Sequence, residues 1–76
     1  MNKKPTEIAI STEYITLGQF LKFADIIYSG AAAKAFLAEN NVLINGELDN
    51  RRGRKLREGD EIMIREKVYK IVKNDC

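Results

Sequence analysis

The chain has 76 residues, 45% of them hydrophobic and 32% charged, with a net charge of +2 at pH 7. This length and composition are typical of one small folded domain, residues 1–76, that buries about 60% of its unfolded surface, and they exclude a disordered chain and a deep, enclosed active site. Because no apolar run reaches the roughly 18 residues that a membrane span needs, and the first residues lack the apolar stretch of a signal peptide, we expect a cytoplasmic protein.

Two short helices are predicted after an N-terminal strand. Residues 6–11 alternate apolar and polar side chains, as a half-buried strand does. The first helix begins at Thr16, which has the spacing of a capping box with Gln19. The second helix begins at Ser29 as its N-cap and ends at the pair Asn40-Asn41. The few residues between the helices predict a tight elbow.

The rest of the chain predicts a small, mostly antiparallel sheet. Asn45-Gly46 between apolar-rich segments indicates a hairpin, because both residues tolerate a positive φ. A turn at Glu58-Gly59-Asp60 leads into a strand, and a reversal at Glu66-Lys67 leads into a final strand over residues 68–73. Two helices followed by such a sheet give an α+β fold.

Positive charge is concentrated in one segment. Residues 51–57 contain five cations and no acid, so the other 69 positions carry a net charge of −3, since +2 less 5 is −3. The cations are Arg51, Arg52, Arg54, Lys55 and Arg57. An arginine can grip a phosphate through two hydrogen bonds, and Gly53 lets the backbone approach a ligand closely. The segment therefore indicates a polyanionic partner, although a solvated charged loop is also open on this pattern alone.

The start of the second helix is a second candidate anion site. Ser29 leaves backbone amides exposed at the positive end of the helix dipole, and Lys34 stands one turn further along on a face otherwise made of alanine. This combination would admit a phosphate. Tyr28 has the right chemistry to stack on a base, but beside two isoleucines we expect it to pack against the protein.

Chemically reactive side chains are few. There is no histidine and one cysteine, Cys76, so the sequence offers neither a histidine general base nor a histidine or thiolate metal site. The acidic residues 58–61 suit a solvated turn better than a metal site, and the isolated glycines form no phosphate loop. We therefore expect no enzyme activity, no cofactor and no metal. The single cysteine agrees with a reducing compartment.

The order of these features resembles the S4 RNA-binding domain over residues 16–64, and within that family the small stand-alone bacterial group called YaaA-like. The matching residues lie in the second helix, the hairpin and the turn before a strand: Ser29, Ala33, Lys34, Val42, Ile44, Asn45, Gly46, Lys55, Leu56, Gly59 and Asp60. The chain departs from the family pattern at Gly30, where many members have arginine, and at residues 16–18, where many have Arg-Leu-Asp. Affinity is then expected to rest more on the basic segment.

The resemblance implies two helices packed on a small sheet, with an RNA surface at the helical elbow and beside it. Carried over by position, it marks Ser29 and Lys34, with the loop Arg51–Lys55 as the basic element of the group and Lys22 as a weaker addition. It also implies binding of ribosomal RNA in ribosome assembly or translation. We expect no membrane or small-molecule partner, and a monomer, because nothing in the sequence demands a dimer.

Two alternatives stay open. One is a protein-interaction module whose basic loop docks on an acidic protein. The other is a ubiquitin-like carrier, although carriers of that kind end in Gly-Gly and this sequence ends in residues 74–76, Asn-Asp-Cys.

Overall fold

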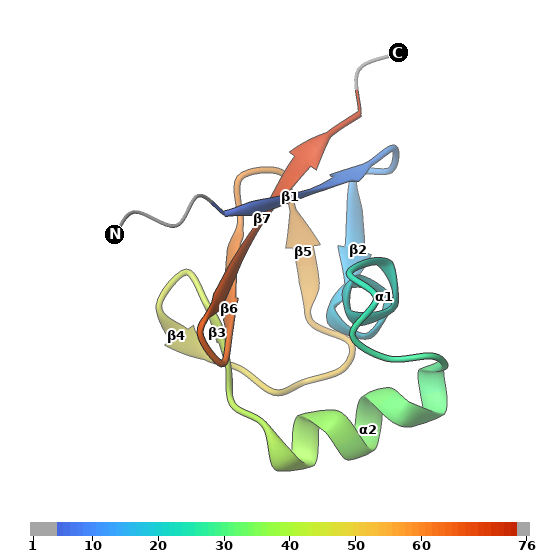
Figure 1. Ribbon diagram of the computed structural model, residues 1–76. Coiled ribbons are helices and arrows are strands. Elements are labelled where there is room, and N and C mark those ends of the chain that lie inside the picture. The colour runs from blue at the N-terminus through green and yellow to red at the C-terminus, as the bar shows by residue number, and fades with distance from the viewer. Residues whose placement is uncertain (1–4, 75–76) are drawn as a thin grey trace.

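The computed structural model describes residues 5–74. These residues fold into a five-stranded mixed sheet, a two-stranded ribbon and two helices that lie to one side of the sheet (Figure 1). The elements are β1 (Thr6–Ile10), β2 (Tyr14–Thr16), α1 (Leu17–Phe23), α2 (Gly30–Glu39), β3 (Val42–Ile44), β4 (Glu47–Leu48), β5 (Lys55–Arg57), β6 (Glu61–Ile64) and β7 (Lys67–Lys73). The large sheet has the order β1-β7-β6-β3-β4, and only β1 and β7 pair in parallel. The predicted α+β class is confirmed.

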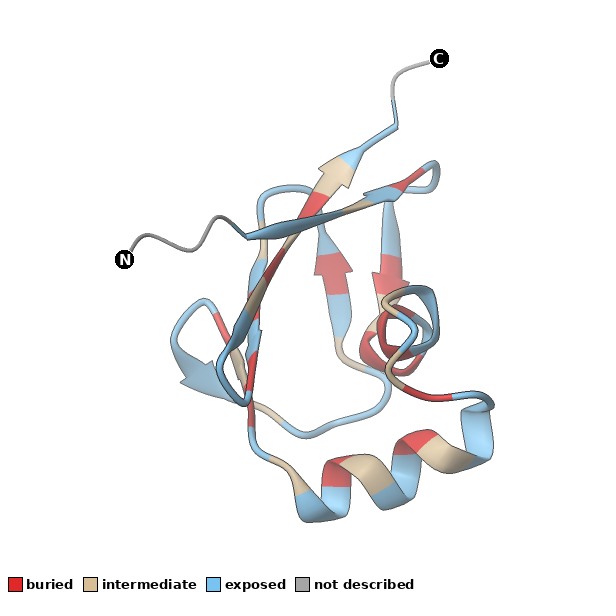
Figure 2. Ribbon diagram, in the orientation of Figure 1, coloured by how far each residue is buried: buried red, intermediate tan, exposed pale blue. Residues whose placement is uncertain are grey.

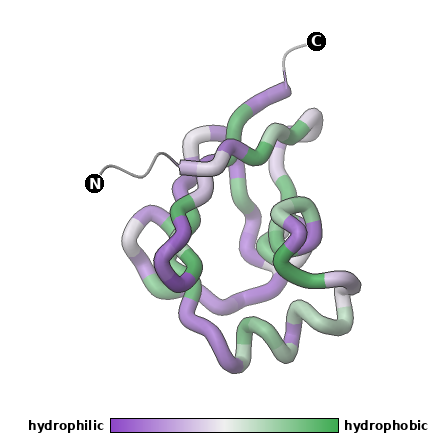
Figure 3. Tube along the Cα trace, in the orientation of Figure 1, coloured by the Kyte–Doolittle hydropathy of each residue, from purple (hydrophilic) through white to green (hydrophobic). Residues whose placement is uncertain are grey.

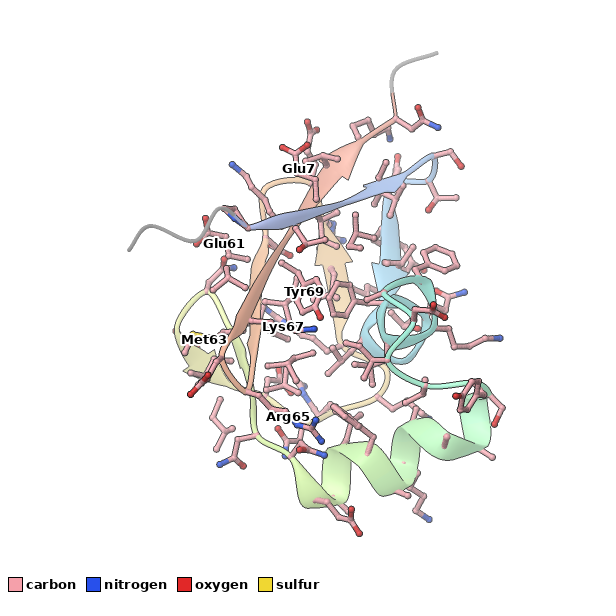
Figure 4. All side chains as sticks on the ribbon, viewed as in Figure 1. Glu7, Glu61, Met63, Arg65, Lys67 and Tyr69 are labelled. Atoms are coloured by element: carbon pink, nitrogen blue, oxygen red, sulfur yellow. The ribbon has the colours of Figure 1, made fainter. Side chains whose placement is uncertain are left out.

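Helix α1 begins where the sequence predicts. The amide of Thr16 donates to Gln19 Oε1 at 3.0 Å, and the amide of Gln19 donates to Thr16 Oγ1 at 3.3 Å, which completes the capping box. Phe20 on the next turn is fully buried and meets Tyr69 of β7 edge to face, with ring centroids 5.3 Å apart. Figure 4 shows Tyr69 directed inward from the sheet toward α1. The helix is thereby fixed on the sheet.

The two predicted turns are joined to each other. Asn45 and Gly46 have φ values of 52° and 85°, as the predicted hairpin requires, and Gly59 has a φ of 93°. Asn45 Nδ2 donates to Asp60 Oδ1 at 3.1 Å, and the amide of Glu61 donates to Asn45 Oδ1 at 3.0 Å. The side chain of Asn45 therefore holds the β3–β4 turn against the start of β6.

The core is formed by residues that point inward from both sheets and both helices (Figure 2). In β6, for example, Ile62 and Ile64 are buried while Glu61 and Met63 are exposed. Among residues 5–74, every buried side chain is hydrophobic, alanine or tyrosine. No helix in this range is long and apolar enough to cross a membrane. Cys76 lies outside the described residues.

Two details differ from the sequence prediction. The ribbon formed by β2 and β5 was not expected, because each strand has three residues and β5 lies in the basic segment. The last reversal is centred one residue earlier than Glu66-Lys67, since Arg65 has a φ of 57° and Lys67 already belongs to β7. Arg65 also ties this turn to α2, donating from Nε to Asn40 Oδ1 at 3.2 Å.

Candidate nucleic-acid interface

The middle of the basic segment is bonded to the start of α1. The amide of Leu17 donates to the carbonyl of Arg54 at 2.7 Å, and the amide of Gly18 donates to the carbonyl of Arg52 at 3.0 Å. With the Gln19 amide bonded to the helix cap, the first three amides of α1 are all used within the protein. They position the segment and are not available to an anion.

Gly18 makes this close approach possible. A Cβ atom at this position would lie 2.8 Å from Cγ of Arg52, which is too close for two carbon atoms. The absence of a side chain at Gly18 therefore leaves room for the side chain of Arg52 against α1.

Asn50, which directly precedes the basic segment, holds the start of the segment on α2. Its Nδ2 donates to the carbonyl of Leu37 at 2.9 Å and to that of Asn40 at 3.2 Å, and its Oδ1 accepts from the amide of Val42 at 3.2 Å. Carbonyl groups at a helix C-terminus lack helical partners, so this amide satisfies two of them. One side chain thus joins the basic segment to α2 and β3.

Asp49 organises the cations at the start of the segment. Its Oδ1 accepts from Nε of Arg51 at 3.0 Å, and its Oδ2 accepts from Nη2 of Arg51 at 2.9 Å. Nε of Arg54 is buried 3.6 Å from the same carboxylate. The hydrogen bonds from Arg51, assisted by the charges of both arginines, lower the pKa of Asp49 from 3.8 to about 2 against the opposing effect of desolvation. The carboxylate is therefore ionised at neutral pH. It holds the guanidinium of Arg51 through two hydrogen bonds and attracts that of Arg54 by charge alone.

The side chains of this segment surround a shallow groove of about 530 Å³, which we call the cation groove. It is lined by Arg51, Gly53, Arg54, Lys55 and Arg57. The side chain of Arg51 remains 73% exposed although it is paired, and Arg52 is exposed next to the groove. Figure 3 shows the corresponding hydrophilic tract between β4 and β5. The structure thus brings four of the five predicted cations to one groove, while the side chain of Arg52 lies against Gly18 of α1.

Part of the predicted loop is a strand. Residues Lys55–Arg57 form β5, which pairs antiparallel with β2 so that Tyr14 lies opposite Arg57. Leu56 is fully buried, whereas its two neighbours point outward. Lys55 Nζ lies 5.0 Å and Arg57 Cζ 5.8 Å from the centroid of the Tyr14 ring. Their charges are therefore displayed from a paired strand, which restricts their backbone more than a loop would.

The other predicted residues lie on the helices, outside the cation groove. Lys22 is exposed and lies four residues after Gly18, so it shares the face of α1 that meets Arg52. Ser29 is the N-cap residue of α2, as predicted, but its side chain makes no capping hydrogen bond. Lys34 is exposed further along α2.

Tyr28 corrects one sequence-based expectation. We expected it to pack against the protein, but it is 99% exposed. Its two isoleucine neighbours are directed into the protein instead, since Ile27 is buried and Ile26 is half-buried. The aromatic ring at the elbow is therefore open to a partner.

The outer side of the five-stranded sheet has a different charge pattern. Lys70 lies between Glu7 and Glu61 on adjacent strands. Figure 4 shows Glu7, Glu61 and Met63 on the side of the sheet away from the helices. Because acids flank the lysine there, this side does not extend the basic surface.

Sequence reasoning missed the residues that shape the interface. Asp49 precedes the cations and acts through the neighbouring Arg51, Asn50 acts through atoms that are distant in sequence, and Gly18 acts through the absence of a side chain. The place of Tyr14 beside the cations had one indirect signal in the sequence. Lys55-Leu56-Arg57 alternates polar and apolar side chains, as a half-buried strand does. A second strand was then needed to pair with it.

Comparison with known proteins agrees with this fold. Residues 8–72 match the family described as the S4 domain. The chain is also 65% identical over 57 residues to the "Probable ribosome maturation protein RlbA" of Bacillus subtilis (strain 168), an alignment that covers 75% of this chain and 80% of that protein. The family match includes every residue of the cation groove.

Proposed function

Because the chain belongs to the S4 domain family, we propose that it is a non-catalytic RNA-binding protein that recognises structured RNA, with ribosomal RNA as its target. The observation that carries the proposal is the cation groove, where four cationic side chains surround Gly53 on a segment held by the amides of α1 and by the preceding Asn50. A concave surface of one charge concentrates polyanions, and the phosphate backbone supplies most of the sequence-independent affinity for nucleic acids.

The groove binds phosphates through arginine forks and lysine charges. The segment is already ordered by Asn50 and by the amides of α1, so binding costs little further loss of backbone freedom. Arg51 presents the part of its guanidinium that Asp49 does not use. Base edges of A-form RNA are hidden in a deep, narrow major groove, so a small rigid surface of this kind reads backbone shape better than sequence.

The helices add further contacts. The amides at the start of α2 hold a second phosphate beside Ser29, where the position of a Cβ on Gly30 has no atom within 4 Å. Lys34 neutralises a neighbouring phosphate from the same helix. Lys22 extends the cationic surface from Arg52 along α1, and Tyr28 stacks on an exposed base at the elbow.

The name of the Bacillus subtilis relative places it in ribosome maturation. We extend that role to this chain, acting as a cytoplasmic monomer on ribosomal RNA during assembly of the ribosome or during translation. The support is the high identity together with a groove whose chemistry fits an RNA backbone.

Neutralising two cations tests the mechanism. With about four phosphates neutralised, the slope of log affinity against log salt concentration is expected near −3 to −4. The double variant Arg51→Gln/Arg52→Gln should reduce that slope by about 2 and weaken binding to all structured RNAs. We leave Arg54 unchanged because its Nε is buried beside Asp49, so its substitution would also disturb the ion pair.

The matched control removes the same charge from the sheet. Lys67→Gln/Lys70→Gln, both in β7, should leave the salt slope unchanged. Circular dichroism establishes that each variant is folded. Equal loss of affinity in both double variants would show that only net charge matters and would contradict a specific groove.

Crosslinking in the native cell, followed by sequencing of the recovered RNA, identifies the target. We expect enrichment of defined ribosomal RNA positions with the wild-type protein and loss of that enrichment in Arg51→Gln/Arg52→Gln. Without any enrichment the proposal fails, and an acidic protein becomes the preferred partner of the basic segment.

A further inference from the structure

A second groove lies beside the cation groove and is bordered by aromatic side chains. It has a volume of about 500 Å³ and lies between the β1–β2 connection and α1, where Tyr14 and Phe23 line it. The two residues are 38% and 57% exposed, whereas Phe20 and Leu21 on the inner face of α1 are fully buried. Both aromatic rings therefore border the groove without being needed to fill the core. We call it the aromatic groove.

Cations border the aromatic groove on one side. Tyr14 lies opposite Arg57 in the β2–β5 ribbon, and Lys55 Nζ is 5.0 Å from the centroid of its ring. Lys55 and Arg57 also line the cation groove. The ribbon is thus a shared wall, and a strand of RNA that leaves the cation groove across β5 reaches Tyr14 next.

The inside of the aromatic groove has a different chemistry from its border. Ser11, Thr12 and Gln19 line it with neutral polar groups, and Glu13 adds a carboxylate. A carboxylate repels a phosphate but tolerates an uncharged base with hydrogen-bond donors. An aromatic wall offers a stacking surface to any base, because every base has a π face.

We propose that the aromatic groove receives an unpaired base of the bound RNA, which stacks on Tyr14 and contacts Phe23, while Lys55 and Arg57 hold the phosphates on either side of it. This inference rests on the proposed RNA-binding function and adds a preference to it. The protein then distinguishes a paired stem, which satisfies the cation groove alone, from a stem with an unpaired nucleotide, which satisfies both grooves.

Three synthetic RNAs test the inference: a blunt, fully paired duplex of two strands, the same duplex with a one-nucleotide bulge, and the same duplex with a three-nucleotide single-stranded extension. Base stacking on an aromatic residue is worth about 1–3 kcal/mol per base, so wild-type protein should bind at least one of the last two about 10-fold more tightly than the first. The ring protons of Tyr14 and Phe23 should shift upfield in NMR spectra with that RNA only.

Variants separate stacking from folding. Tyr14→Leu and Phe23→Leu keep an apolar side chain, and both should lose most of the preference. Because Tyr14 contacts Lys55 and Arg57 of the cation groove, Phe23→Leu is the variant that should also retain the affinity for the paired duplex. Met63→Ala, which removes an exposed apolar side chain on the outer side of the sheet, should keep the preference.

The outcomes distinguish the two proposals. Salt-dependent binding with equal affinity for all three RNAs would overturn the aromatic groove and leave the RNA-binding function standing. A preference that survives in both Leu variants would also overturn it. If the wild-type protein binds none of the three RNAs, the proposed function fails and the inference fails with it.

Discussion

Replacing Asn50 with alanine should loosen the basic segment without touching any of its cations. The substitution removes three hydrogen bonds, two of which are half-buried: those to the carbonyl of Leu37 and from the amide of Val42. At about 1 kcal/mol for each half-buried bond, and little for the exposed one, the free energy of unfolding should fall by about 2 kcal/mol. For a domain of this size that lowers the Tm by roughly 8–16 °C.

The affinity for RNA should fall as well. Without Asn50, one or two residues of the segment regain backbone freedom that binding must remove, at about 1 kcal/mol each. The expected loss is therefore roughly 5- to 30-fold in affinity. Because no charge changes, the salt slope should stay near its wild-type value, which distinguishes this variant from those that remove a cation.

Asn41→Ala is the matched control, since Asn41 is an exposed asparagine whose side chain makes no hydrogen bond within residues 5–74. Thermal unfolding followed by circular dichroism gives the Tm, and fluorescence anisotropy with a labelled RNA hairpin gives the affinity. If Asn50→Ala matches Asn41→Ala in both measurements, Asn50 does not hold the segment. If the Tm falls but the affinity does not, the bonds of Asn50 stabilise the fold without contributing to RNA binding.

Three further predictions test how the segment and its supporting turn are held. Gly18→Ala should displace the side chain of Arg52 and weaken RNA binding severalfold, while the free energy of unfolding stays within about 1 kcal/mol of wild type, because higher helix propensity offsets the overlap. Because the pKa of Asp49 is lowered, its ionised form stabilises the fold above pH 3.8, and this stabilisation is lost as the pH falls to about 2. In urea unfolding from pH 6 to 2, the free energy of unfolding should therefore decline less steeply in Asp49→Asn than in wild type. An identical decline would refute the ion pair. Asn45→Asp places a carboxylate against that of Asp60 and should lower the free energy of unfolding in urea by about 1–2 kcal/mol. Adding Asp60→Asn to the same chain should restore the donor–acceptor pair and the lost stability. Failure to restore it would contradict this contact.

Local signals in the sequence predicted much of the fold. The capping box at Thr16 depends on residues three positions apart, and the Asn45-Gly46 hairpin depends on two neighbours that tolerate a positive φ. The bounds of α2 followed from Ser29 as its N-cap and Asn40 at its end. Each of these features is determined by side chains within one or two turns, so no tertiary information was needed.

The interface depended on contacts that local patterns do not contain. The cations themselves were evident from composition, but their arrangement is set by Asp49 and Asn50, whose side chains look like ordinary turn residues in the sequence. Tyr28 was assigned to packing because its neighbours are apolar, yet the chain turns at the elbow so that only those neighbours face inward. Both errors come from the path of the backbone in space.

The basic segment is held in shape mainly by backbone atoms and by Asn50. Most of its cationic side chains take no part in holding it. The anchors at α1 are the carbonyls of residues 52 and 54, which any amino acid provides, and the anchor at α2 is Asn50. Substitution of Arg52, Lys55 or Arg57 can therefore change the charge pattern at little cost in stability. The same backbone is a ready template for altering which nucleic acids are bound, both by natural drift and by laboratory selection of new binders.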